Sequence, residues 1–161
     1  GPCRWTNTGH SFLFINPMSI PRTRRGLFAT LASLLLIAGC AESISDPIVR
    51  QGFSALDEAY VLDVKPADAK FTNCAYGMVD SRHVVRCGIS YGSTQLAQVG
   101  YWEIEPNNVR FTVYAMNGKA LSALERITRP GTHSTTNFPG AFKSGAGRSP
   151  LNISKVNEVL K

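Results

Sequence analysis

The stretch AKFTNCAYGMVDSRHVVRCGISY, residues 69–91, has two runs rich in aromatic and β-branched residues on either side of Asp80-Ser81. Such runs around a short polar turn predict a β-hairpin, with strands over residues 69–79 and 82–91. A turn centred on Asp80 and Ser81 places Cys74 directly opposite Cys87. Opposite residues in an antiparallel pair have Cα atoms roughly 4.5–5.5 Å apart, which a disulfide tolerates. The hairpin register therefore predicts a Cys74–Cys87 disulfide.

A zinc site is the alternative use of these two cysteines. Structural zinc normally takes four protein ligands, and beyond residue 40 only His83 and His133 could join the cysteines. The sequence has no Cys-x-x-Cys or His-x-x-x-His spacing. We therefore predict the disulfide and no metal site.

A second hairpin is predicted over residues 98–105 and 109–116, around Pro106-Asn107-Asn108. Its cross-strand pairs are ordinary stabilising units of a sheet, so Trp102 is interpreted as a packing residue rather than a ligand platform. A turn centred on Asn107 and Asn108 predicts the pairs Trp102–Val113, Ile104–Phe111 and Glu105–Arg110.

A helix is predicted ahead of the first hairpin. Asp46 can cap its free amides, Pro47 suits its first turn, and Lys65-Pro66 should end it. Apolar residues recur at helical spacing and predict one buried stripe. The stripe consists of Val49, Phe53, Leu56 and Tyr60.

A further helix is predicted after Asn117-Gly118 and should end before Pro130. Its apolar residues are Ala120, Leu121, Leu124 and Ile127.

Glycine and proline interrupt every periodic pattern in residues 129–150, which predicts an extended or mobile segment. Phe138 and Phe142 lie within it and are candidates to dock onto the sheet or onto a partner. A short helix over residues 154–160 ends the chain. We expect this tail to be dispensable for folding and needed for function.

These elements predict a small single α+β domain over residues 47–128. It should contain an antiparallel meander sheet of about four strands with helices packed on one face. One disulfide and a long irregular C-terminal tail over residues 129–161 complete the expected architecture.

The net charge of +6 comes largely from the first 40 residues, which hold four arginines and no acidic side chain. The remainder has 13 (17 − 4) Lys and Arg against 11 Asp and Glu, a net charge of +2 with interspersed signs. Nucleic-acid binding requires a dense basic patch, so we expect no nucleic-acid partner.

A basic region with Arg22, Arg24 and Arg25 precedes an apolar run, residues 27–39, that is too short to cross a membrane. The run ends in Leu36-Ile37-Ala38-Gly39-Cys40. Residues 18–42 thus resemble a bacterial lipoprotein signal and its lipobox. Residues 18–39 would be the signal peptide, and residues 1–17 an untranslated or mis-assigned leader. Twin-arginine export is an alternative to the general route.

The resemblance implies that Cys40 carries diacylglyceryl and palmitate chains, with residues 40–46 as a lipidated tether. Ala41 is not the acidic residue that retains such proteins in the inner membrane. The implied location is the cell outer membrane, with the domain facing the periplasm.

Gly88-Ile89-Ser90-Tyr91-Gly92 matches the nucleophile-elbow pattern of α/β-hydrolases, and Glu125 and His133 follow in the order of that triad. The motif needs a long helix directly after the serine, whereas residues 93–99 are short and lead into another strand. Glu103 and Glu105 would share one strand face, typically a charged outer face. We therefore assign no catalytic residues and no cofactor, and a small serine hydrolase is a distant alternative.

The expected function is a lipid-anchored envelope protein with a non-enzymatic binding or structural role. A periplasmic ligand-binding or inhibitor module is the second hypothesis. The partners would be the membrane, through the lipid, and an envelope protein or peptidoglycan. An exposed apolar patch would favour binding, and its candidate residues are Tyr101, Trp102, Tyr114, Phe138 and Phe142.

Overall fold

The computed structural model describes residues 44–160, so the leader, the signal segment and Cys40 lie outside the described residues. The described residues group into one compact unit. Its elements are α1 (Pro47–Ala59), a π-helical turn (Tyr60–Val64), β1 (Phe71–Val79), β2 (Arg82–Ser90), β3 (Ala97–Asn107), β4 (Arg110–Ala115), α2 (Gly118–Ile127), α3 (His133–Asn137), β5 (Phe142–Ser144) and α4 (Ile153–Val159).

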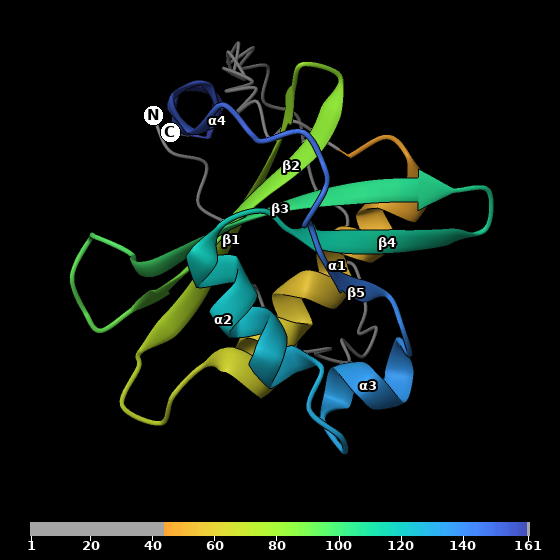
Figure 1. The fold of residues 1–161 in the computed structure, drawn as a ribbon. Coiled ribbons are helices and arrows are strands. Elements are labelled where there is room, and N and C mark those ends of the chain that lie inside the picture. Colours follow the sequence, from red (N-terminus) through yellow and green to blue (C-terminus); the bar gives the residue numbers. More distant parts are fainter. Residues whose placement is uncertain (1–43, 161) are drawn as a thin grey trace, which may run out of the picture. The chain divides into compact units, whose positions relative to one another are not determined.

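The strands form one sheet in the order β1-β2-β3-β4-β5 (Figure 1). The first four strands pair antiparallel in a meander, which confirms the predicted α+β class. A fifth strand, β5, pairs parallel to β4. Parallel neighbours need a crossover connection, and α2 with α3 supplies it.

The first hairpin has the predicted register, with nine continuous pairs from Phe71–Ser90 to Val79–Arg82. Cys74 lies opposite Cys87, their Cα atoms are 4.1 Å apart, and the two residues form a disulfide. The zinc alternative is therefore wrong for these cysteines.

The disulfide should contribute about 3 kcal/mol to the free energy of unfolding, because it closes a short loop in the unfolded chain. Replacing both cysteines by alanine should lower the free energy measured by urea titration by that amount. The wild-type protein under reducing conditions is the control and should approach the variant. Freely alkylatable thiols in the native, unreduced protein would contradict the bond.

The second hairpin pairs two residues away from the predicted register, so the predicted pairs Trp102–Val113, Ile104–Phe111 and Glu105–Arg110 are wrong. Trp102 lies opposite Ala115, and Asn107 opposite Arg110. The turn centres on Asn108-Val109, with Asn108 in the left-handed region at φ 48°. A slip of one residue moves side chains to the other face, but a slip of two does not. Alternation of apolar residues therefore could not choose between the two turns.

Both long helices begin as their sequences predict. The Asp46 carboxylate accepts hydrogen bonds from the amides of Ile48 (2.7 Å) and Val49 (3.2 Å). Asn117 accepts from the Ala120 amide at 2.9 Å, and its own amide group donates to the Val99 carbonyl at 3.0 Å. Asn117 thus both caps α2 and ties it to β3.

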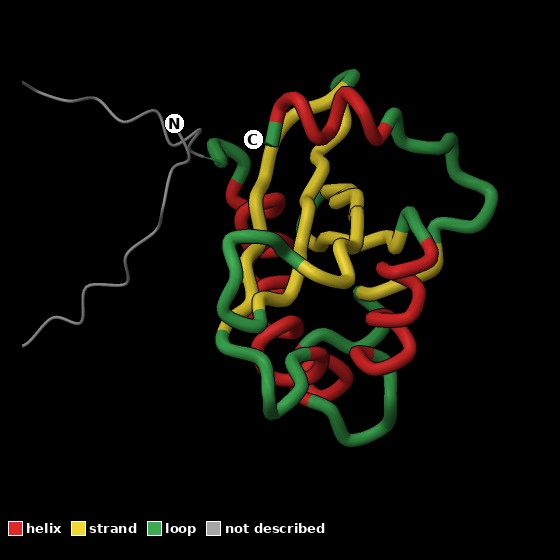
Figure 2. Tube along the Cα trace, turned by 90° about the vertical axis from the view of Figure 1, so that its left-hand side faces the viewer, coloured by secondary structure: helices red, strands yellow, loops and turns green. Residues whose placement is uncertain are grey.

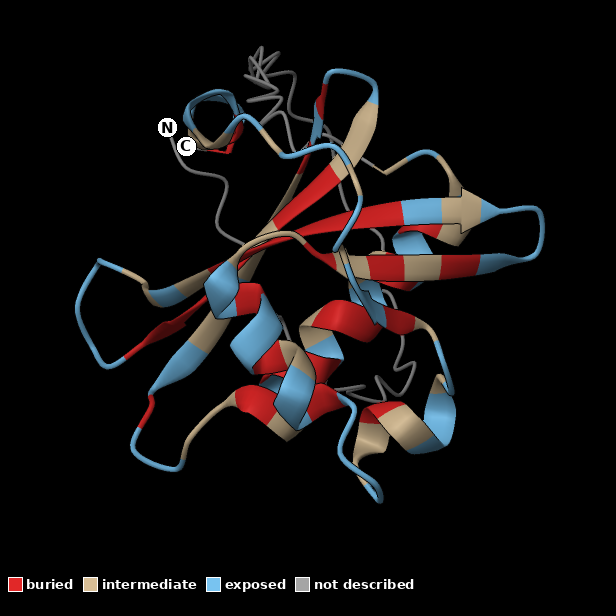
Figure 3. Cartoon of the chain, viewed as in Figure 1, coloured by how far each residue is buried: buried red, intermediate tan, exposed pale blue. Residues whose placement is uncertain are grey.

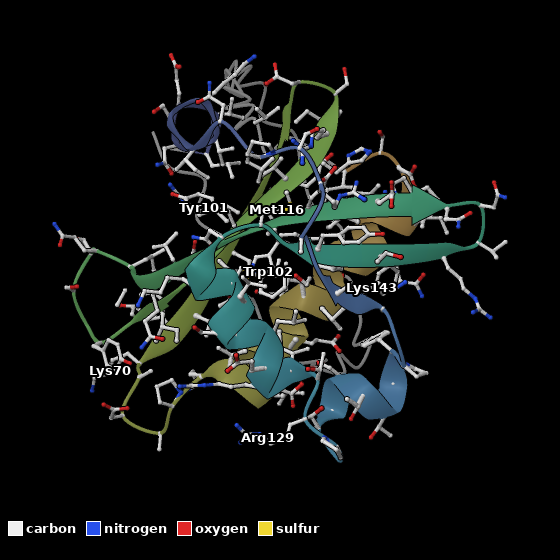
Figure 4. The ribbon with its side chains drawn as sticks, viewed as in Figure 1. Lys70, Tyr101, Trp102, Met116, Arg129 and Lys143 are labelled. Atoms are coloured by element: carbon white, nitrogen blue, oxygen red, sulfur yellow. A yellow bond between two sulfur atoms is a disulfide. The ribbon has the colours of Figure 1, made fainter. Side chains whose placement is uncertain are left out.

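The main core lies between one face of the sheet and the helices α1 and α2. Trp102 is fully buried there, and its indole donates a 3.0 Å hydrogen bond to the Tyr60 hydroxyl. A Cβ on Gly100 would lie 2.5 Å from that hydroxyl, so this close approach requires glycine. Figure 4 shows Trp102 on the side of α1 and α2, and Tyr101 on the side of α4.

A smaller core on the opposite face is made by α4. Val156 and Leu160 are buried there against Val79, Val84 and Tyr101. Figure 2 shows the strands lying between α4 and the other helices. The helices α1 and α2 thus share one face of the sheet, as expected, whereas α4, the expected short helix of the tail, packs on the opposite face.

Residues 129–160 form ordered elements that pack onto the domain, which corrects the expectation of an irregular tail. They contain α3, β5 and α4. Phe142 is 7% exposed and belongs to the main core. A Cβ on Gly145 would lie 2.6 Å from the Ala115 carbonyl oxygen, so glycine lets the chain pass close to β4. The glycines that predicted irregularity thus permit close packing.

Candidate functional site

Among residues 44–160, the largest group of charged side chains with mutual contacts lies on the outer face of the sheet, defined here as the face that carries α4. At its centre the Glu103 side chain is only 7% exposed. Its carboxylate accepts two hydrogen bonds from Arg82, at 3.1 and 2.6 Å, and two from Arg148, both at 3.1 Å. Two guanidinium groups therefore hold one nearly buried carboxylate.

Burial alone would raise the pKa of Glu103. The hydrogen bonds and positive charges of Arg82 and Arg148 outweigh this desolvation, so the pKa of Glu103 lies below its ordinary value. The hydrogen bonds that Arg148 donates to Glu103 likewise raise the pKa of Arg148. Glu103 is therefore ionised at neutral pH, and its negative charge offsets part of the positive charge of Arg82 and Arg148.

Arg148 extends the cluster toward the edge of the sheet. It donates to Glu105 at 3.3 Å and lies over the Tyr114 ring, 4.0 Å from the ring centre. Arg82 also donates to the carbonyls of Ser149 (2.9 Å) and Pro150 (3.3 Å). The cluster therefore fastens the connection between β5 and α4 onto the sheet, and we call this connection, residues 145–152, the strap.

The predicted carboxylate pair Glu103 and Glu105 does share this outer face, as the sequence indicates. Its arginine partners could not be predicted from spacing, because Arg148 lies more than 40 positions along the chain. The sequence expectation of an exposed acidic face is wrong for Glu103, which is nearly buried.

The structure does not bring the hydrolase candidates together. Ser90 is fully buried, where its hydroxyl donates to the Ser93 carbonyl at 3.0 Å and accepts from the Gly92 amide. His133 lies in α3, and its Nε2 is 3.2 Å from a Glu58 carboxylate oxygen. Glu125 is exposed on α2. Ser90 thus has a local structural role in the loop after β2.

Asp63 is a residue that sequence reasoning missed. Its carboxylate accepts hydrogen bonds from the amides of His133 (3.0 Å) and Ser134 (3.1 Å) and from the Ser134 hydroxyl (2.5 Å). These bonds join the π-helical turn to the start of α3. No sequence signal could have found this pairing, because the partners are 70 positions apart.

The five predicted interaction residues do not form an exposed patch. Trp102 and Phe142 lie in the main core, and the Tyr101 hydroxyl donates to Asn157 at 2.7 Å beneath α4. Tyr114 and Phe138 are half-buried, and Phe138 packs 5.9 Å from the Phe111 ring. Figure 3 shows a continuous buried stretch in the middle of β3, and buried residues alternating with intermediate ones along β4. The aromatic residues therefore stabilise the domain.

A pocket of about 200 Å³ lies between α2, α3 and β5, where Ile127, Ser134 and Phe142 contribute to its wall. A smaller pocket borders Tyr60, Lys119 and Arg126. Neither pocket contains Ser90 or His133. Within residues 44–160, no three His, Cys, Asp or Glu side chains are grouped in a way that could hold a metal ion.

Comparison of the chain with protein-family models, with curated proteins and with solved structures found no match.

Proposed function

We propose that this protein is a lipid-anchored cell-envelope protein with a non-enzymatic binding or structural role. The observation that carries the proposal is the lipobox Leu36-Ile37-Ala38-Gly39-Cys40 behind a basic and apolar segment. Acylation of Cys40 would attach the protein to the outer membrane, with its folded domain in the periplasm.

Two structural observations support this proposal. Six residues, 41–46, separate Cys40 from Pro47, where α1 begins, so a short tether joins the lipid to the domain. The Cys74–Cys87 disulfide suits an oxidising compartment such as the periplasm. None of the helices within residues 44–160 has the length and apolar character needed to span a membrane. In this proposal the acyl chains on Cys40 provide the membrane attachment.

The binding or structural role is supported by how the domain uses its reactive side chains. Ser90 bonds within its loop. The cluster of Arg82, Arg148, Glu103 and Glu105 pairs two positive with two negative charges and fastens the strap. These side chains therefore stabilise the fold of the domain. The role is therefore assigned to the surface of the folded domain, through contact with an envelope protein or peptidoglycan.

Cys40→Ser should move the protein from the membrane fraction to the soluble fraction, because the thiol that carries the acyl chains is lost. Fractionation of cells after a salt and carbonate wash measures the change, and incorporation of labelled palmitate measures acylation directly. Cys3→Ser is the matched control and should leave both readouts unchanged. Membrane recovery of Cys40→Ser at the wild-type level would refute the lipid anchor.

A further inference from the structure

Arg86 is an arginine on the outer face of the sheet whose charge is not compensated within residues 44–160. It lies in β2, opposite Ala75 of β1 and Tyr101 of β3, and both of these residues pack in the smaller core. On the same face Arg82 pairs with Glu103. In contrast, none of the ion pairs formed by the described residues includes Arg86.

The Arg86 side chain is half-buried, and its Nε is buried. Among the described residues, this Nε is the only buried side-chain nitrogen or oxygen atom that has no hydrogen-bond partner. Buried polar groups nearly always have a partner, and a charge removed from water is costly unless an opposite charge compensates it. The terminal nitrogens of Arg86 reach the surface. The site is therefore suited to a negatively charged ligand that binds at these nitrogens.

The outer face is covered on both sides of Arg86. On one side lies Leu160, at the end of α4, whose Cδ2 would be 2.7 Å from a Cβ on Gly77. On the other side lies Leu96, in the loop before β3, whose Cβ would be 2.7 Å from a Cβ on Gly88. In the register of the hairpin these covered positions are four residues apart, about 14 Å along the strands. The face between them fits one extended chain, whereas a folded protein would meet α4 and Leu96 first.

Asn73 adds a second polar group to this part of the face. It lies opposite Gly88 and shares the outer side of β1 with Ala75, because side chains alternate along a strand. Its side chain is exposed, so its amide can donate and accept hydrogen bonds. Aromatic residues are enriched in protein–protein interfaces, and here the aromatic candidates lie in the cores or are half-buried. The face is therefore suited to a thin polar ligand with a negative charge.

We propose that Arg86 binds a free carboxylate of the peptides in peptidoglycan, and that Asn73 hydrogen-bonds an adjacent amide group of the same peptide. These peptides are extended and carry free carboxylates, so they match the width and the charge of the site. A guanidinium presents paired donors that fit a carboxylate. This inference rests on the proposed function, because an envelope location brings the domain to peptidoglycan.

Co-sedimentation of the full-length chain, purified in detergent, with isolated peptidoglycan sacculi tests the proposal. Arg86→Gln should weaken binding about tenfold or more, because a charge-assisted hydrogen-bonded contact is lost. Asn73→Asp should also weaken it, because the new carboxylate competes for Arg86 and repels the ligand. Arg110→Gln is the matched control. Arg110 is exposed on β4 of the same sheet, and its substitution removes the same charge and should leave binding unchanged.

Sacculi whose carboxylates have been converted to methylamides test the chemistry of the ligand. The wild-type protein should bind them about tenfold more weakly than untreated sacculi, because the group that pairs with Arg86 is neutralised. Thermal unfolding of each variant near the wild-type midpoint confirms that the domain has folded. Asn73 is exposed, so Asn73→Asp gives a folded test of the site even where Arg86→Gln lowers stability.

Any of three results overturns the proposal: no binding of wild type to untreated sacculi, equal binding to methylamidated sacculi, or equal losses from Arg86→Gln and Arg110→Gln. Wild-type binding by folded Asn73→Asp overturns it as well. Cell fractionation of the wild-type protein reports the lipid anchor separately. Membrane recovery without sacculus binding would refute this inference alone, whereas sacculus binding by a wild-type protein that carries no acyl chain would refute the anchor alone.

Discussion

Deleting residues 130–161 should abolish the cooperative thermal transition of the domain. The deletion removes Phe142 from the main core and Val156 and Leu160 from the smaller core. Loss of the Phe142 side chain alone costs about 3–5 kcal/mol. The whole free energy of unfolding of a domain this size is about 5–15 kcal/mol, so the combined loss approaches the total.

Two point substitutions locate the effect within the deleted segment. Phe142→Ala should lower the free energy of unfolding by about 3–5 kcal/mol, because the buried ring leaves a cavity. Phe138→Ala is the matched control, and its half-buried ring should cost less than half as much. Calorimetry and urea titration measure both. A cooperative transition of the truncated protein near the wild-type midpoint would show instead that these contacts are marginal.

The sequence predicted the elements whose signals are local. The Asp46-Pro47 and Asn117-Gly118 caps marked the helix starts. The Asp80-Ser81 turn predicted the register of the first hairpin, and the cysteine spacing agreed with it. The second hairpin lacked such a constraint. A turn centred on Asn107-Asn108 and one centred on Asn108-Val109 place the same residues on the buried face. The protein has the second turn, in which Asn108 adopts the left-handed conformation.

The tail and the charged cluster could not be predicted because their partners are distant in sequence. β5 has three residues, too few for a periodic pattern, and it forms only because β4 offers an edge. After β5 pairs with β4, the chain continues along the sheet and brings Arg148 into hydrogen-bonding distance of Glu103. Glycine and proline content shows where regular structure is interrupted, but it does not show whether the interrupted chain packs against a sheet.

Glu103→Gln should lower the free energy of unfolding by about 3 kcal/mol at pH 7, because Arg82 and Arg148 then lose the charge that compensates them in a mostly buried site. Glu105→Gln is the matched control, on the same strand and beside the same Arg148. Its side chain is 48% exposed, so it should cost no more than about 1 kcal/mol. Urea titration measures both, and equal losses would refute the central position of Glu103.

The same carboxylate predicts how stability depends on pH. The pKa of Glu103 is lower in the folded protein than its ordinary value of 4.5, so the folded state favours the ionised form. Its contribution is fully present above that ordinary value and is lost as the pH falls through the lowered pKa. Glu103→Gln cannot titrate at this position. The difference in free energy of unfolding between wild type and Glu103→Gln should therefore be constant above about pH 5 and should shrink toward zero below about pH 4. A difference that stays constant down to pH 2 would show that Glu103 is protonated alike in both states, and that Arg82 and Arg148 do not hold its charge.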